Sequence, residues 1–285
     1  MKLVSWNIQW SRGVDGTVSP QRIVDDARAL ADFDVLCLQE VAANFPALPG
    51  SRGEDQFEAF ARLLPGFTPV SAPAVDVGAP DGTRRLFGNM LLSRYPVLRV
   101  LRHQLPWPLE PDAISMPRVL IEATLDTPLG PIVVMNTHLE YYSKTQRSAQ
   151  IEALRRIHQD NCMRAAGSRV QDRSGSPYHA FAATSRTILT GDFNLRPEDA
   201  LHARVQAPFD GDGANVPRLV DTWQHLHGTK PRPHNVGVYD REQWPEAFAC
   251  DFIFASEDLL PRVRAFRVDG DTRSSDHQPQ LLELA

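Results

Sequence analysis

The sequence has few cysteines and no long hydrophobic run. Its three cysteines, Cys37, Cys162 and Cys250, are too few and too scattered for a disulfide framework, and free thiols are typical of a reducing compartment. No positively charged leader followed by an apolar stretch opens the chain, and no segment approaches the ~20 apolar residues of a membrane helix. We therefore expect a soluble, cytoplasmic protein without a membrane anchor.

Positive charge is not in excess either. Lysine and arginine number 30 against 35 aspartates and glutamates, a formal net charge of −5. Tight binding to nucleic acid of any sequence relies on many basic side chains, because contacts with phosphates supply most of that affinity. This composition excludes an overall basic surface and leaves room for a locally basic cleft.

Several metal-binding signatures are absent as well. The chain contains no Cys-x-x-Cys and no His-Glu-x-x-His spacing, and its nine histidines do not cluster as zinc ligands do. It also lacks the string of carboxylates that forms an EF-hand, which argues against a calcium-stabilised structural domain. Without repeats, low-complexity tracts or linkers, the 285 residues are interpreted as a single α/β domain over 1–285.

The first half of the chain predicts a strand-helix-strand unit. Residues 3–8 form an apolar strand pattern, and Ser19 followed by Pro20 is a typical start of a helix. The continuously apolar run 35–38 then predicts a second, buried strand that ends near Glu40. Since a unit of ~30 residues places its two parallel strands side by side, Asn7 and Glu40 should lie at the same edge.

Further elements follow from periodicity and turn residues. A helix is predicted over 57–64 and another after Ser143, and the remaining strand patterns cover 89–93, 97–102, 119–125, 131–137, 187–190, 252–254, 262–268 and 280–284. Residues 167–177 are polar and predict a mobile loop. The stretch 208–245 is interpreted as a long insertion overhanging the rim of a cleft, with a helical turn around Leu219, Val220 and Trp223.

Polar residues stand at the ends of several of these apolar runs. They are His138, Asp192 with Asn194, Asp251, and the pair Asp276-His277. Each has an ordinary structural explanation when taken alone, such as an Asx turn, a helix cap or an ion pair. The conjunction favours a common site instead. If the chain stays extended after residue 192, the spacing of two would point both side chains there to one face.

These residue types suit the hydrolysis of a phosphoester. The reaction needs neutralisation of the non-bridging oxygens, an activated water in line with the leaving oxygen, and help for that leaving group. The carboxylates of Glu40 and Asp276 and the amide carbonyl of Asn7 are hard oxygen ligands. Such ligands suit Mg²⁺ or Mn²⁺.

Seven strings in this order resemble the endonuclease/exonuclease/phosphatase superfamily, which includes deoxyribonucleases, neutral sphingomyelinases, inositol polyphosphate 5-phosphatases and deadenylases. The resemblance spans almost the whole chain and implies an α/β fold, a four-layer α-β-β-α sandwich with two packed mixed β-sheets flanked by helices. The strings are Trp6-Asn7-Ile8, Gln39-Glu40, residues 88–96, Asn136-Thr137-His138-Leu139, Gly191-Asp192-Phe193-Asn194, Asp251-Phe252-Ile253-Phe254 and Ser275-Asp276-His277.

The resemblance implies a metal site and a phosphate site. Glu40 would be the principal metal ligand, with Asn7 and Asp276 completing or supporting it. Arg118 and Arg147 resemble phosphate-side positions of the superfamily, although an arginine near a helix start is often only solvated.

The same resemblance implies roles in catalysis. Asp192 would orient and deprotonate the attacking water, and Asn194 would donate a hydrogen bond to a phosphate oxygen. His277, oriented by Asp251, would stabilise the transition state or transfer a proton. His138 matches the branch with histidine in its string and not the abasic-site endonucleases, which argues against a base-excision repair enzyme.

The favoured interpretation is a Mg²⁺- or Mn²⁺-dependent phosphodiesterase or nuclease that acts on DNA, RNA or a nucleotide. Two alternatives stay open: hydrolysis of a small soluble or lipid head-group phosphoester, and a binding module without turnover. No obligate protein partner is evident from the sequence.

Overall fold

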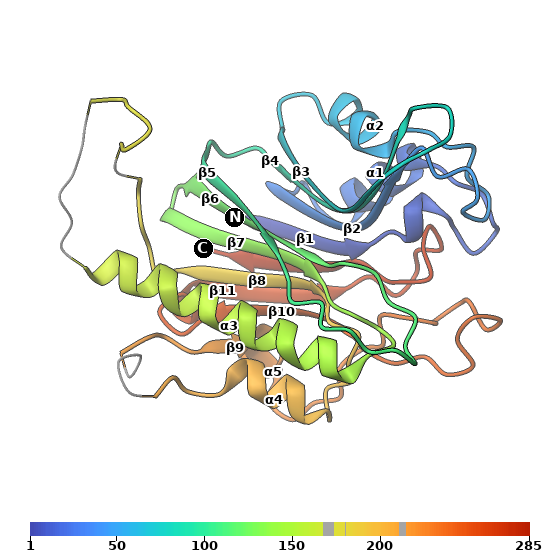
Figure 1. Cartoon of the computed structure of the whole chain (residues 1–285). Coiled ribbons are helices and arrows are strands. Elements are labelled where there is room, and N and C mark those ends of the chain that lie inside the picture. The colour runs from blue at the N-terminus through green and yellow to red at the C-terminus, as the bar shows by residue number, and fades with distance from the viewer. Residues whose placement is uncertain (168–173, 180, 211–214) are drawn as a thin grey trace.

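The computed structural model describes residues 1–167, 174–179, 181–210 and 215–285 (Figure 1). The loop expected over 167–177 lies mostly outside these residues, as do residues 211–214 of the expected insertion. No helix in the described ranges is both long enough and apolar enough to cross a membrane.

Strands of the described chain form two mixed six-stranded sheets. The first has the order β11-β12-β1-β2-β4-β3 and the second the order β5-β6-β7-β8-β10-β9. The strands of the first sheet are β1 (Lys2–Asn7), β2 (Val35–Ala43), β3 (Thr68–Gly78), β4 (Arg84–Ser93), β11 (Val263–Val268) and β12 (Gln280–Leu284). Those of the second are β5 (Val97–Gln104), β6 (Val119–Thr127), β7 (Gly130–His138), β8 (Thr187–Asp192), β9 (Leu219–Asp221) and β10 (Asp251–Ser256).

Helices cover the outer faces of the two sheets (Figure 1). On the first sheet lie α1 (Pro20–Leu30) and α2 (Gln56–Leu63), and on the second lie α3 (Lys144–Ala166) and α4 (Ala200–Gln206). A short helix, α5 (Thr222–His227), packs against β9, β10 and β11, and short 3₁₀ turns occupy Gln9–Ser11 and Leu260–Arg262. The expected four-layer sandwich is therefore confirmed.

The predicted helix starts are also confirmed. Ser19 and Ser143 accept hydrogen bonds from backbone N–H groups in the first turns of α1 and α3, which satisfies donors that a helix leaves unpaired. Pro20 takes the first helical position, where its missing N–H costs nothing.

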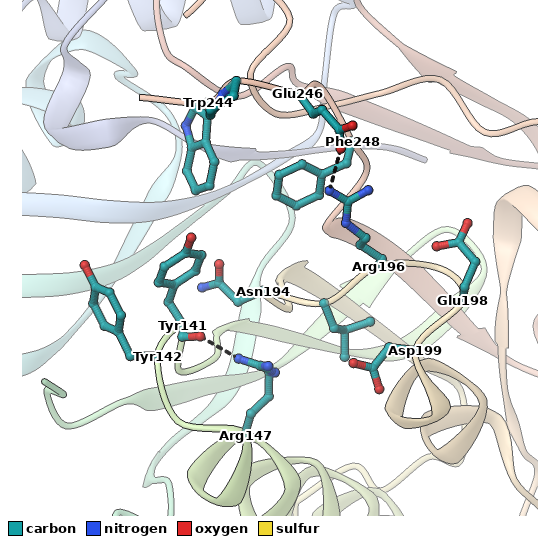
Figure 2. Close-up of a pocket in the computed structure, with 12 residues that line it drawn as sticks. Tyr141, Tyr142, Arg147, Asn194, Arg196, Glu198, Asp199, Trp244, Glu246 and Phe248 are labelled. Carbon is teal, nitrogen blue, oxygen red and sulfur yellow. Dashed lines mark hydrogen bonds and ion pairs between the residues drawn. The ribbon is translucent and has the colours of Figure 1, made fainter. Parts of the chain in front are cut away.

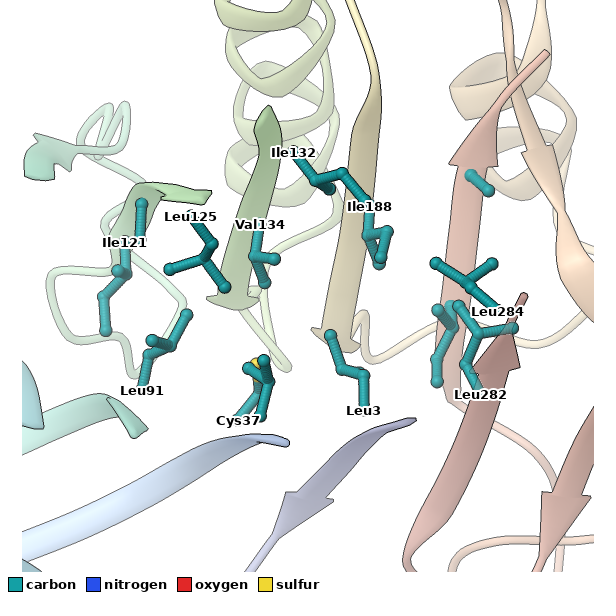
Figure 3. Packing of buried hydrophobic residues seen from close by; sticks show 14 of the residues in the cluster. Leu3, Cys37, Leu91, Ile121, Leu125, Ile132, Val134, Ile188, Leu282 and Leu284 are labelled. Carbon is teal, nitrogen blue, oxygen red and sulfur yellow. The ribbon is translucent and has the colours of Figure 1, made fainter. Parts of the chain in front are cut away.

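The main core lies between the sheets (Figure 3), where side chains such as Leu3, Cys37, Val134 and Ile188 are fully buried. The buried amide of Asn136 links the two sheets in this layer. Asn136 Nδ2 donates to the carbonyls of Leu38 at 3.1 Å and Met90 at 3.0 Å. The asparagine of the Asn-Thr-His-Leu string thus fixes one sheet against the other.

The centre of each sheet is its one parallel pair among the described strands. Strands β1 and β2 are parallel and joined through α1, and β7 and β8 are parallel and joined through α3. In the sandwich β1 packs on β8 and β2 packs on β7. The carboxyl ends of all four strands therefore meet at one edge, bringing together Asn7, Glu40, His138 and Asp192.

Sequence patterns missed two elements and mistook a third. Strand β3 escaped notice because Pro69 and Pro73 interrupt its pattern, and prolines are tolerated there since β3 is an edge strand. Helix α4 was not expected. The helical turn expected around Leu219, Val220 and Trp223 is confirmed only at Trp223: residues 219–221 form β9, and helix α5 begins at Thr222, capped by Asp221.

Candidate active site

Backbone strain is concentrated at the strand ends and at the bulge of β2 that form the site. A β-bulge shifts the register of β2 between Leu38 and Val41, and Glu40 in this bulge has φ 61°. Asn194 (φ 50°) and the turn Gln9–Ser11 (φ 44°, 43° and 61°) also adopt left-handed conformations. Such conformations cost about 1–3 kcal/mol each and cluster at functional sites, where bulges re-aim side chains.

Gly191 sets the distance between β7 and β8. Its φ is 140°, and a Cβ at this position would lie 1.8 Å from the carbonyl oxygen of Thr137. Only glycine permits this approach of the two strands. The next pair in register is His138 with Asp192, so the glycine of the Gly-Asp-Phe-Asn string places these two side chains together.

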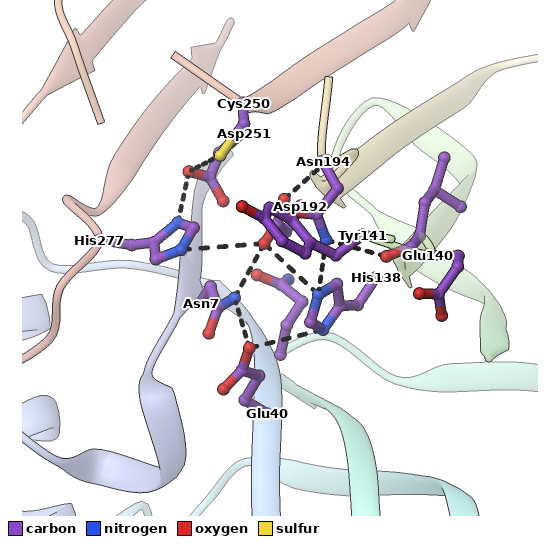
Figure 4. A network of polar contacts seen from close by, with 12 residues as sticks. Asn7, Glu40, His138, Glu140, Tyr141, Asp192, Asn194, Cys250, Asp251 and His277 are labelled. Carbon is purple, nitrogen blue, oxygen red and sulfur yellow. Dashed lines mark hydrogen bonds and ion pairs between the residues drawn. The ribbon is translucent and has the colours of Figure 1, made fainter. Parts of the chain in front are cut away.

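Asn7 bridges two carboxylates at the centre of the site (Figure 4). Its Nδ2 donates to Glu40 Oε1 at 3.1 Å and to Asp192 Oδ2 at 2.9 Å. The backbone N–H of Gln9 donates to Asn7 Oδ1 at 3.1 Å, which fixes the orientation of the amide. Asn7 therefore turns its nitrogen, not its carbonyl oxygen, toward the carboxylates.

Glu40 and Asp276 fit a divalent cation. Burial, together with the nearby Asp276 carboxylate, raises the pKa of Glu40 to about 7, although the hydrogen bond from Asn7 opposes this change. Glu40 Oε2 has no hydrogen-bond partner in the described part of the chain. Two carboxylates that repel each other at the end of a cavity are a donor set of the kind that Mg²⁺ or Mn²⁺ prefers.

Two side chains of the insertion 208–245 hold Asp276 by hydrogen bonds. Its Oδ2 accepts hydrogen bonds from the indole Nε1 of Trp244 at 2.9 Å and from Gln243 Nε2 at 3.3 Å. Gln243 in turn accepts from Gln9 Nε2 at 2.9 Å. The strained turn after β1 and the segment before β10 are thus joined around one carboxylate.

His277 and Asp251 form a buried pair. His277 Nδ1 lies 2.9 Å from Asp251 Oδ2, and its Nε2 lies 3.8 Å from Asp192 Oδ2. Burial alone would lower the pKa of His277, but the carboxylates of Asp251, Asp276 and Asp192 raise it well above the usual range. Asn235 Nδ2 fixes the backbone carbonyl of Asp251 at 2.9 Å. The histidine is therefore a cation with one N–H facing Asp192.

Asp192 is ionised despite its burial. Burial alone would raise its pKa, but the neighbouring imidazole of His277 and hydrogen bonds from Asn7 and Asn194 outweigh burial and lower it. The backbone N–H of Asn194 donates to Asp192 Oδ1 at 2.8 Å. The chain therefore turns after residue 192, with an Asx-type hydrogen bond. The extended conformation considered from the sequence is not the one that the structure has.

His138 and Asn194 form the opposite wall. Burial lowers the pKa of His138 to about 3, so the ring is neutral. Asn194 Nδ2 donates to His138 Nε2 at 3.0 Å and to the carbonyl of Leu139 at 2.9 Å. Both amide protons of Asn194 are used in this conformation. Donation to a phosphate requires that a substrate oxygen replace one of these two acceptors.

The two arginines differ in position. Arg118 is buried, its Nε donates to Glu140 Oε2 at 3.2 Å, and its buried Nη1 has no partner in the described residues. It lines the same cavity as Glu40. Arg147 instead donates Nη1 to the carbonyls of Glu140 (2.7 Å) and Tyr141 (2.8 Å) and does not line this cavity.

Two adjoining cavities open at this edge. The first, of about 420 Å³, is lined by Glu40, Asp192, Asp276 and His277 among others. The second, of about 880 Å³, lies beside it (Figure 2). Sequence reasoning missed several lining residues: Gln9, Trp10, Met116, Tyr141 and Tyr142. Gln243 and Trp244 also line this cavity and belong to the stretch 208–245 that was expected to overhang the cleft. The one available signal was that Tyr141 and Tyr142 follow the Asn-Thr-His-Leu string almost directly.

A second group of ligand atoms competes for a metal ion. Atoms of Asp192, Cys250, Asp251 and His277 all lie within 4.8 Å of one another. Burial raises the pKa of the Cys250 thiol well above its usual range, so it stays protonated, and His277 is cationic. Metals bind thiolate and neutral imidazole, so the chemistry here favours a hydrogen-bonded relay.

The model of the Endonuclease/Exonuclease/phosphatase family matches residues 4–277. The chain belongs to this family. Members of the family are metal-dependent phosphoester hydrolases, and this chain is accordingly a hydrolase that acts on phosphoesters. The resemblance found in the motifs is thereby confirmed. No significant match was found among curated protein sequences.

Solved structures of the endonuclease/exonuclease/phosphatase fold are similar over the whole chain. One from Beutenbergia cavernae DSM 12333 is 25% identical, with a TM-score of 0.67, and covers 100% of this chain and 72% of that chain. The mannosyl-6-phosphatase Bt3783 of Bacteroides thetaiotaomicron VPI-5482 is 18% identical (TM-score 0.64; 100% and 99% covered). The human Nocturnin catalytic domain is 18% identical (TM-score 0.63; 100% and 93% covered). The latter two likenesses support the fold alone.

Proposed function

We propose that this protein is a Mg²⁺- or Mn²⁺-dependent phosphodiesterase that acts on nucleic acid or a nucleotide through in-line attack of water. One observation carries the proposal: the carboxylates of Glu40, Asp276 and Asp192 and the imidazole of His277 line the same cavity of about 420 Å³. Each of the three demands of phosphoester hydrolysis then has a group to meet it.

Glu40 and Asp276 would hold the metal ion, which supplies neutralisation of charge on the phosphate. Asn7 supports the site by tying Glu40 to Asp192. Ligation by Asn7 itself requires its amide to flip and to give up the bond from Gln9 N–H.

Asp192 is the base that orients and deprotonates water. Its ionised carboxylate already accepts from Asn7 and Asn194, so its orientation is set before substrate arrives. The N–H of His277 opposite Asp192 is placed to donate to an oxygen of the transition state, with Asp251 fixing the ring. Arg118, which lines the cavity, supplies a donor for a phosphate oxygen. Arg147 acts indirectly, by holding the chain at Tyr141.

Hydrolysis of a small phosphoester is the second candidate. The larger cavity is lined by the carboxylates of Glu198, Asp199 and Glu246 as well as by Arg147 and Arg196. These carboxylates repel the further phosphates of a polynucleotide, which favours a substrate with a single phosphate.

Two wider expectations belong to the same proposal. Residues 1–285 act as one domain, supported by the pairing of β12 near the C-terminus with β1. The protein works in the cytoplasm, supported by three buried free thiols.

Hydrolysis of supercoiled plasmid and of bis(p-nitrophenyl) phosphate tests the function. Wild type and the exposed control Asp25→Asn should act on the substrate in Mg²⁺ or Mn²⁺, and Asp192→Asn should be about 10²–10⁴-fold slower, since it lacks the base. Hydrolysis of the ester without nicking of the plasmid would select the small-phosphoester candidate. Equal rates for Asp192→Asn and wild type would contradict the mechanism.

A further inference from the structure

We propose that the larger cavity beside the catalytic centre binds the organic group of the substrate, as an uncharged ring that carries N–H or O–H donors. Nucleobases and sugar rings share this chemistry. The inference rests on the proposed function and names the substrate class that the site takes.

The two cavities adjoin each other. They share Tyr141, Tyr142, Asn194 and Trp244 in their linings. Because Asn194 contacts both Asp192 and His138, a phosphate held at the centre has its substituents next to this shared wall. A group of the size of a nucleoside or hexose then extends into the larger space of about 880 Å³.

Aromatic rings from two distant segments form the shared wall (Figure 2). The rings of Tyr141 and Trp244 are 5.8 Å apart at 80°, and those of Trp244 and Phe248 are 5.6 Å apart at 74°. Tyr141 packs edge-on against Tyr142 at 4.8 Å. Tyr141 is 43% and Tyr142 65% exposed, so ring faces remain free for stacking.

The charges around the cavity select the kind of ring. Arg196 is already engaged, because it pairs with Glu246 at 3.3 Å and lies over the Phe248 ring at 4.5 Å. Glu198 has no hydrogen-bond or ion-pair partner in the described part of the chain and is exposed. Asp199 uses one oxygen to cap α4. Arg147 also lines the cavity, but its Nη1 is engaged with the carbonyls of Glu140 and Tyr141. Among the acidic side chains, Glu198 and the second oxygen of Asp199 stay free as acceptors, which suit N–H and O–H donors.

The test compares three p-nitrophenyl phosphodiesters whose second substituent is methyl, 5′-thymidyl or 6-glucosyl. In wild type, kcat/KM for at least one of the two ring-bearing esters should exceed kcat/KM for the methyl ester by at least about tenfold. The ester with the higher kcat/KM shows whether the cavity prefers a nucleoside or a sugar. Phe248→Ala and Glu198→Gln should each lower kcat/KM for the ring-bearing ester more than kcat/KM for the methyl ester, and so remove most of this advantage. Glu242→Gln, which lines neither cavity, is the matched control.

Binding gives a second readout that does not need turnover. By calorimetry, thymidine 5′-monophosphate or glucose 6-phosphate should bind wild type about tenfold more tightly than methyl phosphate, and Phe248→Ala and Glu198→Gln should lose this difference. Equal binding of all three ligands, or an unchanged difference in both variants, would overturn the inference. If the inference is overturned but the methyl ester is still hydrolysed, the proposed function stands without the ring-binding cavity.

Discussion

The indole of Trp244 is expected to support metal binding by holding Asp276. Replacing Trp244 with phenylalanine keeps an aromatic ring beside Tyr141 and Phe248 but removes the N–H that donates to Asp276 Oδ2 at 2.9 Å. A hydrogen bond to a charged group contributes about 1.5–3 kcal/mol. The loss of an outer partner of a metal ligand typically lowers metal affinity by about 10–100-fold, which matches this range.

Titrating Mg²⁺ while the rate of bis(p-nitrophenyl) phosphate hydrolysis is followed measures the effect. For Trp244→Phe, the half-saturating Mg²⁺ concentration should rise by about 10–100-fold, while kcat at saturating Mg²⁺ should stay within about threefold of wild type. Calorimetric titration with Mn²⁺ should show the same loss without any turnover.

Trp223→Phe is the matched control. Its indole N–H donates to the carbonyl of Lys230 at 3.2 Å, and the side chain lines neither of the two cavities at the site. The Mg²⁺ dependence of this control should equal that of wild type. The reasoning is refuted if Trp244→Phe also keeps the wild-type Mg²⁺ dependence, since Asp276 would then need no support from the insertion.

Two further predictions concern stability. Gly191→Ala should lower the free energy of unfolding, measured in urea, by about 2–4 kcal/mol, because the added Cβ would lie 1.8 Å from the Thr137 carbonyl oxygen. Gly16→Ala is the control, since Gly16 has φ 76° but no atom within 4 Å of the added Cβ, and it should lower the free energy of unfolding by less. Equal losses in the two variants would contradict a steric clash at Gly191. Burial lowers the pKa of His158 from its ordinary 6.5, so the unfolded chain binds the proton first and stability should fall as the pH drops below about 6.5. His158→Gln should reduce this fall in urea midpoints between pH 7 and pH 5, and an unchanged slope would count against the assignment.

Patterns along the chain predicted the architecture because they report which faces are buried. The strand-helix-strand unit placed Asn7 beside Glu40, and the structure joins the two at 3.1 Å. Strand β3 was missed since edge strands tolerate prolines, which otherwise end a strand pattern. Local periodicity thus works best where an element is central and regular.

The details of the site were less predictable, because they depend on departures from regular structure. The bulge at Glu40 and the left-handed turn at Gln9–Ser11 contain no glycine, so the sequence gives no local signal of their positive φ angles. The contact of Trp244 with Asp276 joins positions 32 residues apart through a segment without a motif. Such features depend on tertiary packing, which spacing within one strand or helix does not reveal.

The position of the metal ion is the central claim, and crystals grown with Mn²⁺ and measured at the manganese absorption edge test it most directly. The account predicts one anomalous peak within about 2–2.5 Å of carboxylate oxygens of both Glu40 and Asp276. A peak next to Asp251 and His277 and away from Glu40 would contradict the account. The metal site would then lie at the Asp251–His277 pair, which is interpreted as a hydrogen-bonded relay.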